Sequence, residues 1–221
     1  ALAGTATKTY DGNNTASTTN ITYATTGGLN GETSYTYTNT GATYDTANAG
    51  TGKTVTMAGV QFVSATNASG QTIYGYALDS NPVVGNIGTV NKAVLTITGS
   101  KTYDGTTSFT AGQLTVTGLV GSDSVATATA NDANVATANK YFTGFTMGTG
   151  LVGNYELSAA GANNSATITP LLLTVTGQRA FISSTNTTFQ TADLSVSGAV
   201  SGETVALTAG TGTTSSGNAG T

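Results

Sequence analysis

The stretch LTITGSKTYDGTTSF (95–109) decides the expected fold, because its apolar residues alternate with Thr until a Tyr-Asp-Gly triplet interrupts them. Alternation with a period of two, rich in β-branched residues, is typical of strands with one buried face. Similar alternation occurs at residues 53–60, 114–120, 171–177 and 194–200. Short runs rich in Gly, Asn and Asp separate these segments and favour turns. We therefore predict an all-β fold.

The chain also repeats itself. KTYDG at 8–12 returns unchanged at 101–105, and a diverged copy of the surrounding stretch, LTVTGQRAFISSTNTTF, covers 173–189. Other segments align in the same order: LTVTGLVGSDSV (114–125) matches LSVSGAVSGETV (194–205). Head-to-tail copies of this size indicate tandem modules, each with its own small core.

The repeats predict three units. Module 1 covers 1–91, module 2 covers 92–170, and the first half of a third module covers 171–221. We expect each to be a small β-sandwich, with an Ig-like or a β-grasp-like topology left open. The expected half module would leave strand edges unpaired, which either a longer native chain or strands added by a neighbouring copy would satisfy.

The boundaries between modules contain no flexible Gly/Ser linker. Only NKA separates two strand patterns between Ile87 and Thr98, and only TPL does so between Ile168 and Thr176. Flexible linkers are usually rich in Gly and Ser. The sequence therefore predicts a semi-rigid, end-to-end rod, in which copies of the chain could also associate by end-to-end packing.

Composition limits the possible partners. Charged residues make up 7% of the chain, the net charge is −4, and only six residues are basic, so nucleic-acid binding is not expected. The absence of Cys, together with few charges and abundant Gly, favours an exported bacterial protein without disulfides. No apolar run reaches the roughly 18–20 residues needed to cross a bilayer, so no membrane insertion is expected in this segment. We expect the protein to lie outside the cell or on a bacterial surface.

Taken together, KTYDGTTSF, NAGTGKTVTMAGV, GNYEL and ATITPLLLTVTG resemble the YDG-type repeat, a relative of the MBG repeats. Such repeats occur in long bacterial surface exoproteins similar to filamentous haemagglutinin, and the resemblance extends over nearly the whole chain. It implies an extracellular stalk or adhesive function, in adhesion or in a biofilm matrix, and no chemistry assigned to particular residues. The third unit departs from the motif, since Arg179, Phe181, Ile182 and Ser183 replace Lys101, Tyr103, Asp104 and Gly105.

The Tyr-Asp-Gly triplets have two interpretations. A functional one is a carbohydrate or Ca²⁺ contact through the ring and the carboxylate. A structural one is a turn with Gly at positive φ, Asp bonded to nearby backbone and Tyr at the edge of the core. The structural interpretation is favoured, because the ten acidic residues are scattered and Ca²⁺ needs 6–8 oxygen ligands. The residues concerned are Tyr10, Asp11, Gly12, Tyr103, Asp104 and Gly105.

Catalysis is not expected. The chain has neither His nor Cys, and no cofactor or metal motif stands out. Asp45 and Lys53, like Asp132 and Lys140, are eight positions apart, which a salt bridge across a hairpin explains. One covalent possibility remains, a Lys–Asn or Lys–Asp isopeptide bond through Lys8 and Lys101, whose place in the third unit is taken by an Arg.

The expected function is therefore structural, as a segment of an extracellular fibre or adhesin that projects or assembles through its repeats. The alternative is a module that binds polysaccharide, with host or matrix glycans as partners. Exposed aromatic rings commonly supply such contacts. That alternative would use Tyr10, Tyr74, Tyr76 and Tyr103.

Overall fold

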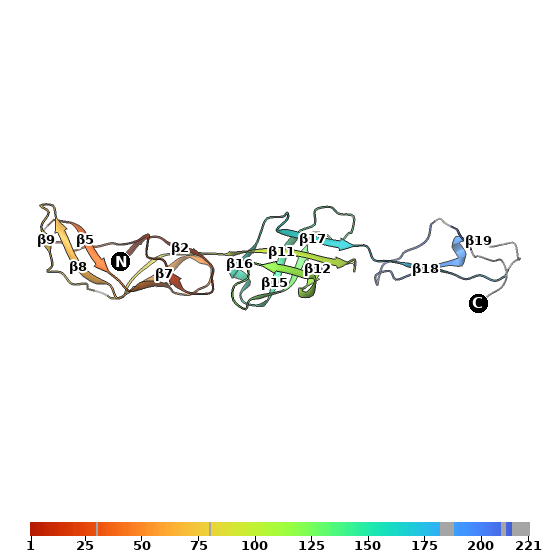
Figure 1. The fold of residues 1–221 in the computed structure, drawn as a ribbon, viewed down its shortest axis with the longest axis horizontal. Coiled ribbons are helices and arrows are strands. Elements are labelled where there is room, and N and C mark those ends of the chain that lie inside the picture. The colour runs from red at the N-terminus through yellow and green to blue at the C-terminus, as the bar shows by residue number, and fades with distance from the viewer. Residues whose placement is uncertain (30, 80, 182–187, 209–210, 214–221) are drawn as a thin grey trace.

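A computed structural model describes residues 1–29, 31–79, 81–181, 188–208 and 211–213. The described chain consists of β-strands, turns and three short 3₁₀ segments and contains no α-helix, so the all-β prediction is confirmed. Three units follow one another along the long axis of the molecule (Figure 1). Ile182 and Ser183, which replace the motif in the third unit, lie outside the described residues.

Module 1 is built on a five-stranded sheet in the order β2-β10-β7-β6-β3. The strands β2 (Ala6–Thr9) and β10 (Val83–Asn91) run parallel, with Gly88 opposite Ala6 and Asn91 opposite Thr9. The remaining neighbours are antiparallel: β7 (Gly50–Ala58), β6 (Gly41–Tyr44) and β3 (Thr15–Ala16). A separate antiparallel pair joins β1 (Leu2–Gly4) to β4 (Ile21–Tyr23).

Module 1 also carries an arm. The strands β5 (Glu32–Thr38), β8 (Gln61–Asn67) and β9 (Thr72–Ile73) form a three-stranded sheet at the end of the molecule away from module 2 (Figure 1). This extension explains why Tyr10 and Tyr103 are 93 positions apart, whereas the equivalent residues Tyr103 and Phe181 are only 78 positions apart.

Module 2 repeats the same plan with a longer first strand, β11 (Ala93–Thr102). Its first part pairs in parallel with β16 (Tyr155–Leu157), and its second part pairs in parallel with β17 (Asn164–Thr169) and antiparallel with β13 (Leu114–Thr117). A second sheet contains β12 (Ser108–Thr110), β14 (Ser124–Ala130) and β15 (Phe142–Thr149) in the order β12-β14-β15.

The alternation of apolar and polar residues in the sequence corresponds to alternating burial of side chains along the strands. In β11 the side chains of Ala93, Leu95 and Ile97 are buried, whereas the intervening residues are less so. Module 2 packs these residues with Phe109 and Phe142, whose rings meet edge to face at 5.1 Å. Module 1 has its own core around Tyr44, Val55 and Met57. The prediction of tandem small β modules is therefore confirmed.

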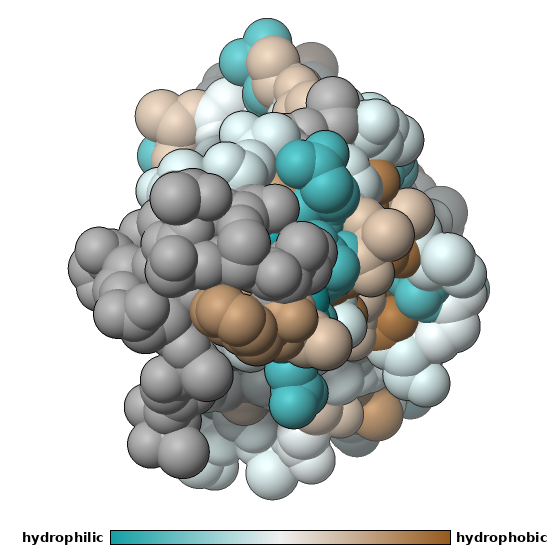
Figure 2. All heavy atoms as spheres, turned by 90° about the vertical axis from the view of Figure 1, so that its right-hand side faces the viewer, coloured by the Kyte–Doolittle hydropathy of each residue, from teal (hydrophilic) through white to brown (hydrophobic). Residues whose placement is uncertain are grey.

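The third unit contains β18 (Thr174–Gly177) paired with β20 (Leu194–Ser197), and β19 (Thr188–Phe189) paired with β21 (Gly212–Thr213). Within the described residues, β18 has no second partner of the kind that β16 and β17 give to β11. As a result Leu173 and Val175 are 42% and 51% exposed, whereas their equivalents Leu95 and Ile97 are fully buried. Figure 2, which faces this end of the molecule, shows hydrophobic residues at the surface.

The modules follow each other almost without interruption. Only Lys92 separates β10 from β11, so the last strand of module 1 passes directly into the first strand of module 2. Four residues, Pro170 to Leu173, separate β17 from β18. Because Pro has a fixed φ, it limits the conformations of this second connection.

Candidate functional site

The Tyr-Asp-Gly loops lie at the exits of their modules. Since β2 and β10 are parallel, both end at the same edge of the sheet, and the chain leaves module 1 from there. The Tyr10 amide donates to the Asn91 carbonyl at 2.8 Å, and the Tyr103 amide donates to the Thr169 carbonyl at 2.8 Å. Each loop therefore faces the unit that follows it.

Within each loop the Asp and the Gly form a tight turn. The Oδ1 atom of Asp11 accepts from the Asn13 amide at 3.1 Å, and that of Asp104 accepts from the Thr106 amide at 2.9 Å. Gly12 and Gly105 have φ values of 82° and 77°, a region that side chains other than Gly rarely adopt. This is the arrangement of an Asx turn.

A buried lysine fixes the loop from inside. The Lys101 side chain is fully buried, and its Nζ donates to Asp104 Oδ1 at 2.6 Å, to the Thr106 and Ser108 carbonyls and to Thr106 Oγ1. Lys8 Nζ lies 2.7 Å from Asp11 Oδ1 and also donates to the Asn13 carbonyl and Oδ1. These contacts give both amines structural partners within their own loops, and the crosslinked form remains a prediction.

Charge within the loop is stabilised accordingly. The hydrogen bond from Lys101 lowers the pKa of Asp104, against a smaller opposing effect of burial. Burial opposes the charge of Asp11, yet the hydrogen bond from Lys8 and the Asn13 amide lower its pKa below the ordinary value. Both carboxylates are therefore ionised at neutral pH.

The third unit keeps the cation although it loses the triplet. Arg179 Nη1 donates to the Thr188 carbonyl, which corresponds to that of Ser108, and its guanidinium lies 5.0 Å from the Phe189 ring. Lys101 Nζ lies 4.9 Å from the equivalent ring of Phe109. The cation beside an aromatic ring is therefore common to modules 2 and 3.

The second lysine of each complete module is also buried. Lys53 Nζ lies 2.8 Å from Asp45 Oδ1, as a bridge across the hairpin would require. Lys140 Nζ instead donates to the Val135 and Thr137 carbonyls, while Asp132 accepts from the Asn134 amide.

The outer side of the first loop contacts module 2. The Tyr10 ring meets the Tyr155 ring edge to face at 5.5 Å, and Tyr10 packs against the cores of both modules. A methyl group placed on Gly12 would lie 3.1 Å from Val120 Cγ1. Beside them, the buried Asn154 accepts from the Ala49 amide at 2.9 Å and donates to Asn48 Oδ1 at 3.1 Å.

The second loop makes a corresponding contact with the third unit. Tyr103 OH donates to Glu203, and a methyl group placed on Gly105 would lie 3.2 Å from Val200 Cγ1. Val200 is the counterpart of Val120 in the aligned segments. Sequence reasoning missed this role, because it did not anticipate the parallel pairing that brings the loops to the module boundaries.

Tyr155 organises the receiving surface of module 2. Its hydroxyl donates to Asp123 Oδ2 at 2.6 Å and accepts from the Val120 amide at 3.1 Å. Burial, followed by the hydrogen bond to Asp123, raises the pKa of Tyr155 to about 12. The tyrosine therefore stays protonated and holds the 118–123 loop in place.

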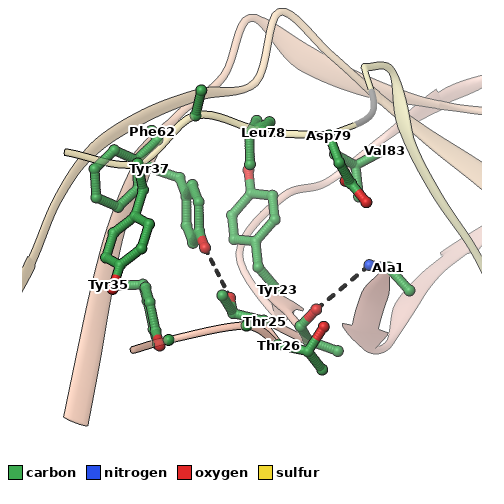
Figure 3. Close-up of a pocket in the computed structure, with 15 residues that line it drawn as sticks. Ala1, Tyr23, Thr25, Thr26, Tyr35, Tyr37, Phe62, Leu78, Asp79 and Val83 are labelled. Atoms are coloured by element: carbon green, nitrogen blue, oxygen red, sulfur yellow. Dashed lines mark hydrogen bonds between the residues drawn. The ribbon is translucent and has the colours of Figure 1, made fainter. Parts of the chain in front are cut away.

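Module 1 holds a cavity of about 340 Å³ between residues 23–28 and the arm strands β5 and β8 (Figure 3). Tyr23 and Tyr37 lie against each other at 4.6 Å, Phe62 meets Tyr37 at 6.0 Å, and Thr25 Oγ1 lies 2.7 Å from Tyr37 OH. Further lining residues are Tyr35, Tyr76, Leu78 and Asp79.

The four tyrosines considered for glycan binding do not lie together. Tyr10 and Tyr103 contact the units that follow their loops, Tyr76 lines the cavity, and Tyr74 is 73% exposed. The aromatic cavity itself was not anticipated, because its rings come from three different strands, whose alternation alone gives no sign of a hollow. Tyr23 is on β4, Tyr35 and Tyr37 are on β5, and Phe62 is on β8.

Two further features of the described residues concern the requirements of a metal site and of a membrane-spanning helix. Over the described ranges, no three His, Cys, Asp or Glu side chains gather as a metal site would require. The same part of the chain has no helix that is long and apolar enough to cross a bilayer.

These observations define a tandem-repeat β protein whose units meet through a Tyr-Asp-Gly loop. The family model of the YDG domain matches residues 1–82 and 89–166, so the chain belongs to the YDG domain family. Comparison with curated proteins and with solved structures gives no match.

Proposed function

We propose that the chain is a structural segment of a bacterial extracellular fibre or adhesin, a semi-rigid spacer that acts without catalysis. The main support is the arrangement of the three units along one axis, joined with a single residue between β10 and β11 (Figure 1). A boundary crossed by nearly continuous strand and covered by side-chain contacts resists bending more than a flexible linker does.

The low charge fits this role. With 7% charged residues, the surface depends little on ion pairs, and its contacts should change little with salt. Such a surface suits an extracellular location, in adhesion or in a biofilm matrix.

Small-angle scattering of the chain tests the proposal. We expect an elongated, rigid particle for the chain and a broader range of conformations when eight Gly/Ser residues are inserted after Asn91, because such a linker is flexible. The matched control carries the same insertion after Ser69, in a turn of the arm. Equal flexibility of the chain and the variant inserted after Asn91 would mean that the boundary already bends freely, and the spacer proposal would fail.

Polysaccharide binding is the second candidate, supported by the cavity lined with aromatic and hydroxyl side chains in module 1. Aromatic faces and nearby hydroxyl groups are suited to sugar rings. A glycan array probed with the chain and with Tyr35→Ala tests it, with Tyr74→Ala as an exposed control. Binding lost only in Tyr35→Ala, with the fold intact, supports this candidate.

A further inference from the structure

We infer that the end of module 1 opposite module 2 is a docking surface for the Tyr-Asp-Gly loop of another YDG module, joined in front of Ala1. This inference deepens the proposed spacer function and rests on it. It names the partner as a loop with the sequence Lys-Thr-Tyr-Asp-Gly, delivered by a strand that continues into β1 as β10 continues into β11.

Module 2 already receives such a loop on one of its surfaces. In module 2 that surface, here called the acceptor, consists of Val120, Asp123 and Tyr155. Tyr155 OH donates to the Asp123 carboxylate and accepts from the Val120 amide. Tyr10 and Gly12 of the preceding module rest on Tyr155 and Val120.

Module 1 reproduces the acceptor with its own residues. Tyr76, the counterpart of Tyr155, donates its hydroxyl to Glu32 and accepts from the Leu29 amide at 3.0 Å. Leu29 therefore stands where Val120 stands, and Glu32 where Asp123 stands. In both modules a backbone amide donates to a tyrosine hydroxyl, which in turn donates to a carboxylate. The two segments that form these hydrogen bonds share little sequence identity.

The two acceptors differ in what covers them. Tyr155 is 2% exposed and Val120 is partly buried under the Tyr10 loop. By contrast, Leu29 is 83% exposed, and Tyr76 borders the open aromatic cavity. An exposed Leu beside a hollow lined by aromatic rings offers apolar area that a Tyr side chain would cover.

One difference between the acceptors predicts their relative strength. Asn154, which bonds Asn48 and Ala49 of the preceding module, is replaced by Gly75 in module 1. A Cβ added at Gly75 would have no atom within 4 Å, so the position has open space for a side chain. The Gly75→Asn variant should therefore bind the loop more firmly.

The test is a chain in which residues 1–93 are placed directly before Ala1, so that the added copy supplies the loop. Hydrogen exchange of residues 28–33 in the original copy is compared with that in the unextended chain. We expect exchange to slow by about tenfold or more, as protection follows burial of an amide, and to slow further with Gly75→Asn. Replacing Tyr10 by Ala in the added copy alone should restore fast exchange, whereas Tyr74→Ala in the original copy should not.

Unchanged exchange at 28–33, with residues 118–123 still protected, would overturn the docking inference and leave the spacer function intact. If residues 118–123 also lacked protection from exchange, the result would count against both the docking inference and the spacer function. A third outcome, protection of 28–33 by soluble glycan but not by the added copy, would assign the surface to polysaccharide and also overturn the inference.

Discussion

Lys101 shows how one side chain supports a loop that later contacts another module. Its Nζ has four acceptors, two of them backbone carbonyls that would lose a partner if the amine were removed. Leaving buried acceptors unpaired usually costs more than the net gain of the bonds themselves. The third unit has a cation, Arg179, at the equivalent position despite the lost triplet, which agrees with this structural role.

We expect Lys101→Met to lower the free energy of unfolding by about 2–3 kcal/mol, because the methylene volume is kept while the hydrogen bonds are lost. This loss of stability is moderate, because the Asp104 side chain is 49% exposed and can be solvated. Urea denaturation followed by tyrosine fluorescence measures it. Lys92→Met, at an exposed position, serves as the control and should change stability by less than about 0.5 kcal/mol.

Tyr155 gives the molecule a pH dependence on the alkaline side. Its pKa in the folded chain is about 12, against an ordinary value of 10.0. A raised pKa contributes stability that is present in full below pH 10 and is lost as the pH rises through the folded value. We expect unfolding at about pH 11 to require less urea than at about pH 9. In Tyr155→Phe this decrease should be smaller, and an equal decrease in both proteins would contradict the assignment.

The turn of the Tyr-Asp-Gly loop could be predicted from the sequence, but the contact of its tyrosine with the next module could not. The Asp and Gly of the triplet indicate a turn by their local preferences alone. The contact of Tyr10 with Tyr155 joins residues 145 positions apart and depends on which strand ends lie together. Local pattern carries no information on that point.

For the strands, too, the sequence predicts the local structure but not the contacts between distant segments. Alternation identified β11 and β18 equally well, since LTITG and LTVTG are nearly identical. Their burial nevertheless differs, because β11 has the parallel neighbours β16 and β17 and, within the described residues, β18 has only β20. Burial of a strand therefore depends on partners that its own sequence does not specify.

This difference leads to a prediction for β18. A peptide with the sequence of residues 154–169 contains the strands that cover β11, and we expect it to bind the third unit beside Leu173 and Val175. Strand addition of this kind combines backbone hydrogen bonds with burial of alternate side chains. Slower hydrogen exchange in residues 173–177 on adding the peptide measures the effect.

The control peptide carries Asp at the positions of Ala166 and Ile168, which are buried in module 2, and should not bind. If both peptides bind equally, the interaction is not strand addition. Binding of the unaltered peptide would also support association of neighbouring copies through the same edge.

At the scale of the whole molecule, the strand topology determines the direction in which the modules follow one another. A parallel first and last strand places the loop of each complete module where the chain leaves it, so that both Tyr-Asp-Gly loops contact the unit that follows. The arm of module 1 lies at the opposite end (Figure 1). Module 2 therefore receives a loop at one end and presents its own loop at the other, and repetition of this contact extends the chain in one direction.

The stiffness of the first boundary should depend on Tyr10, because this ring packs against both cores while Lys92 alone links the strands. We expect Tyr10→Ala to widen the distance distribution between spin labels on Cys introduced at Gln61 and Thr115, which are exposed positions in a chain without native Cys. Stability should fall by only about 1–2 kcal/mol, since the ring is partly buried. Tyr74→Ala, which removes a ring of the same size from an exposed site, should leave the distribution unchanged. A distribution equally narrow in Tyr10→Ala would show that strand continuity alone holds the modules in line, and that the Tyr-Asp-Gly loop contributes nothing to their orientation.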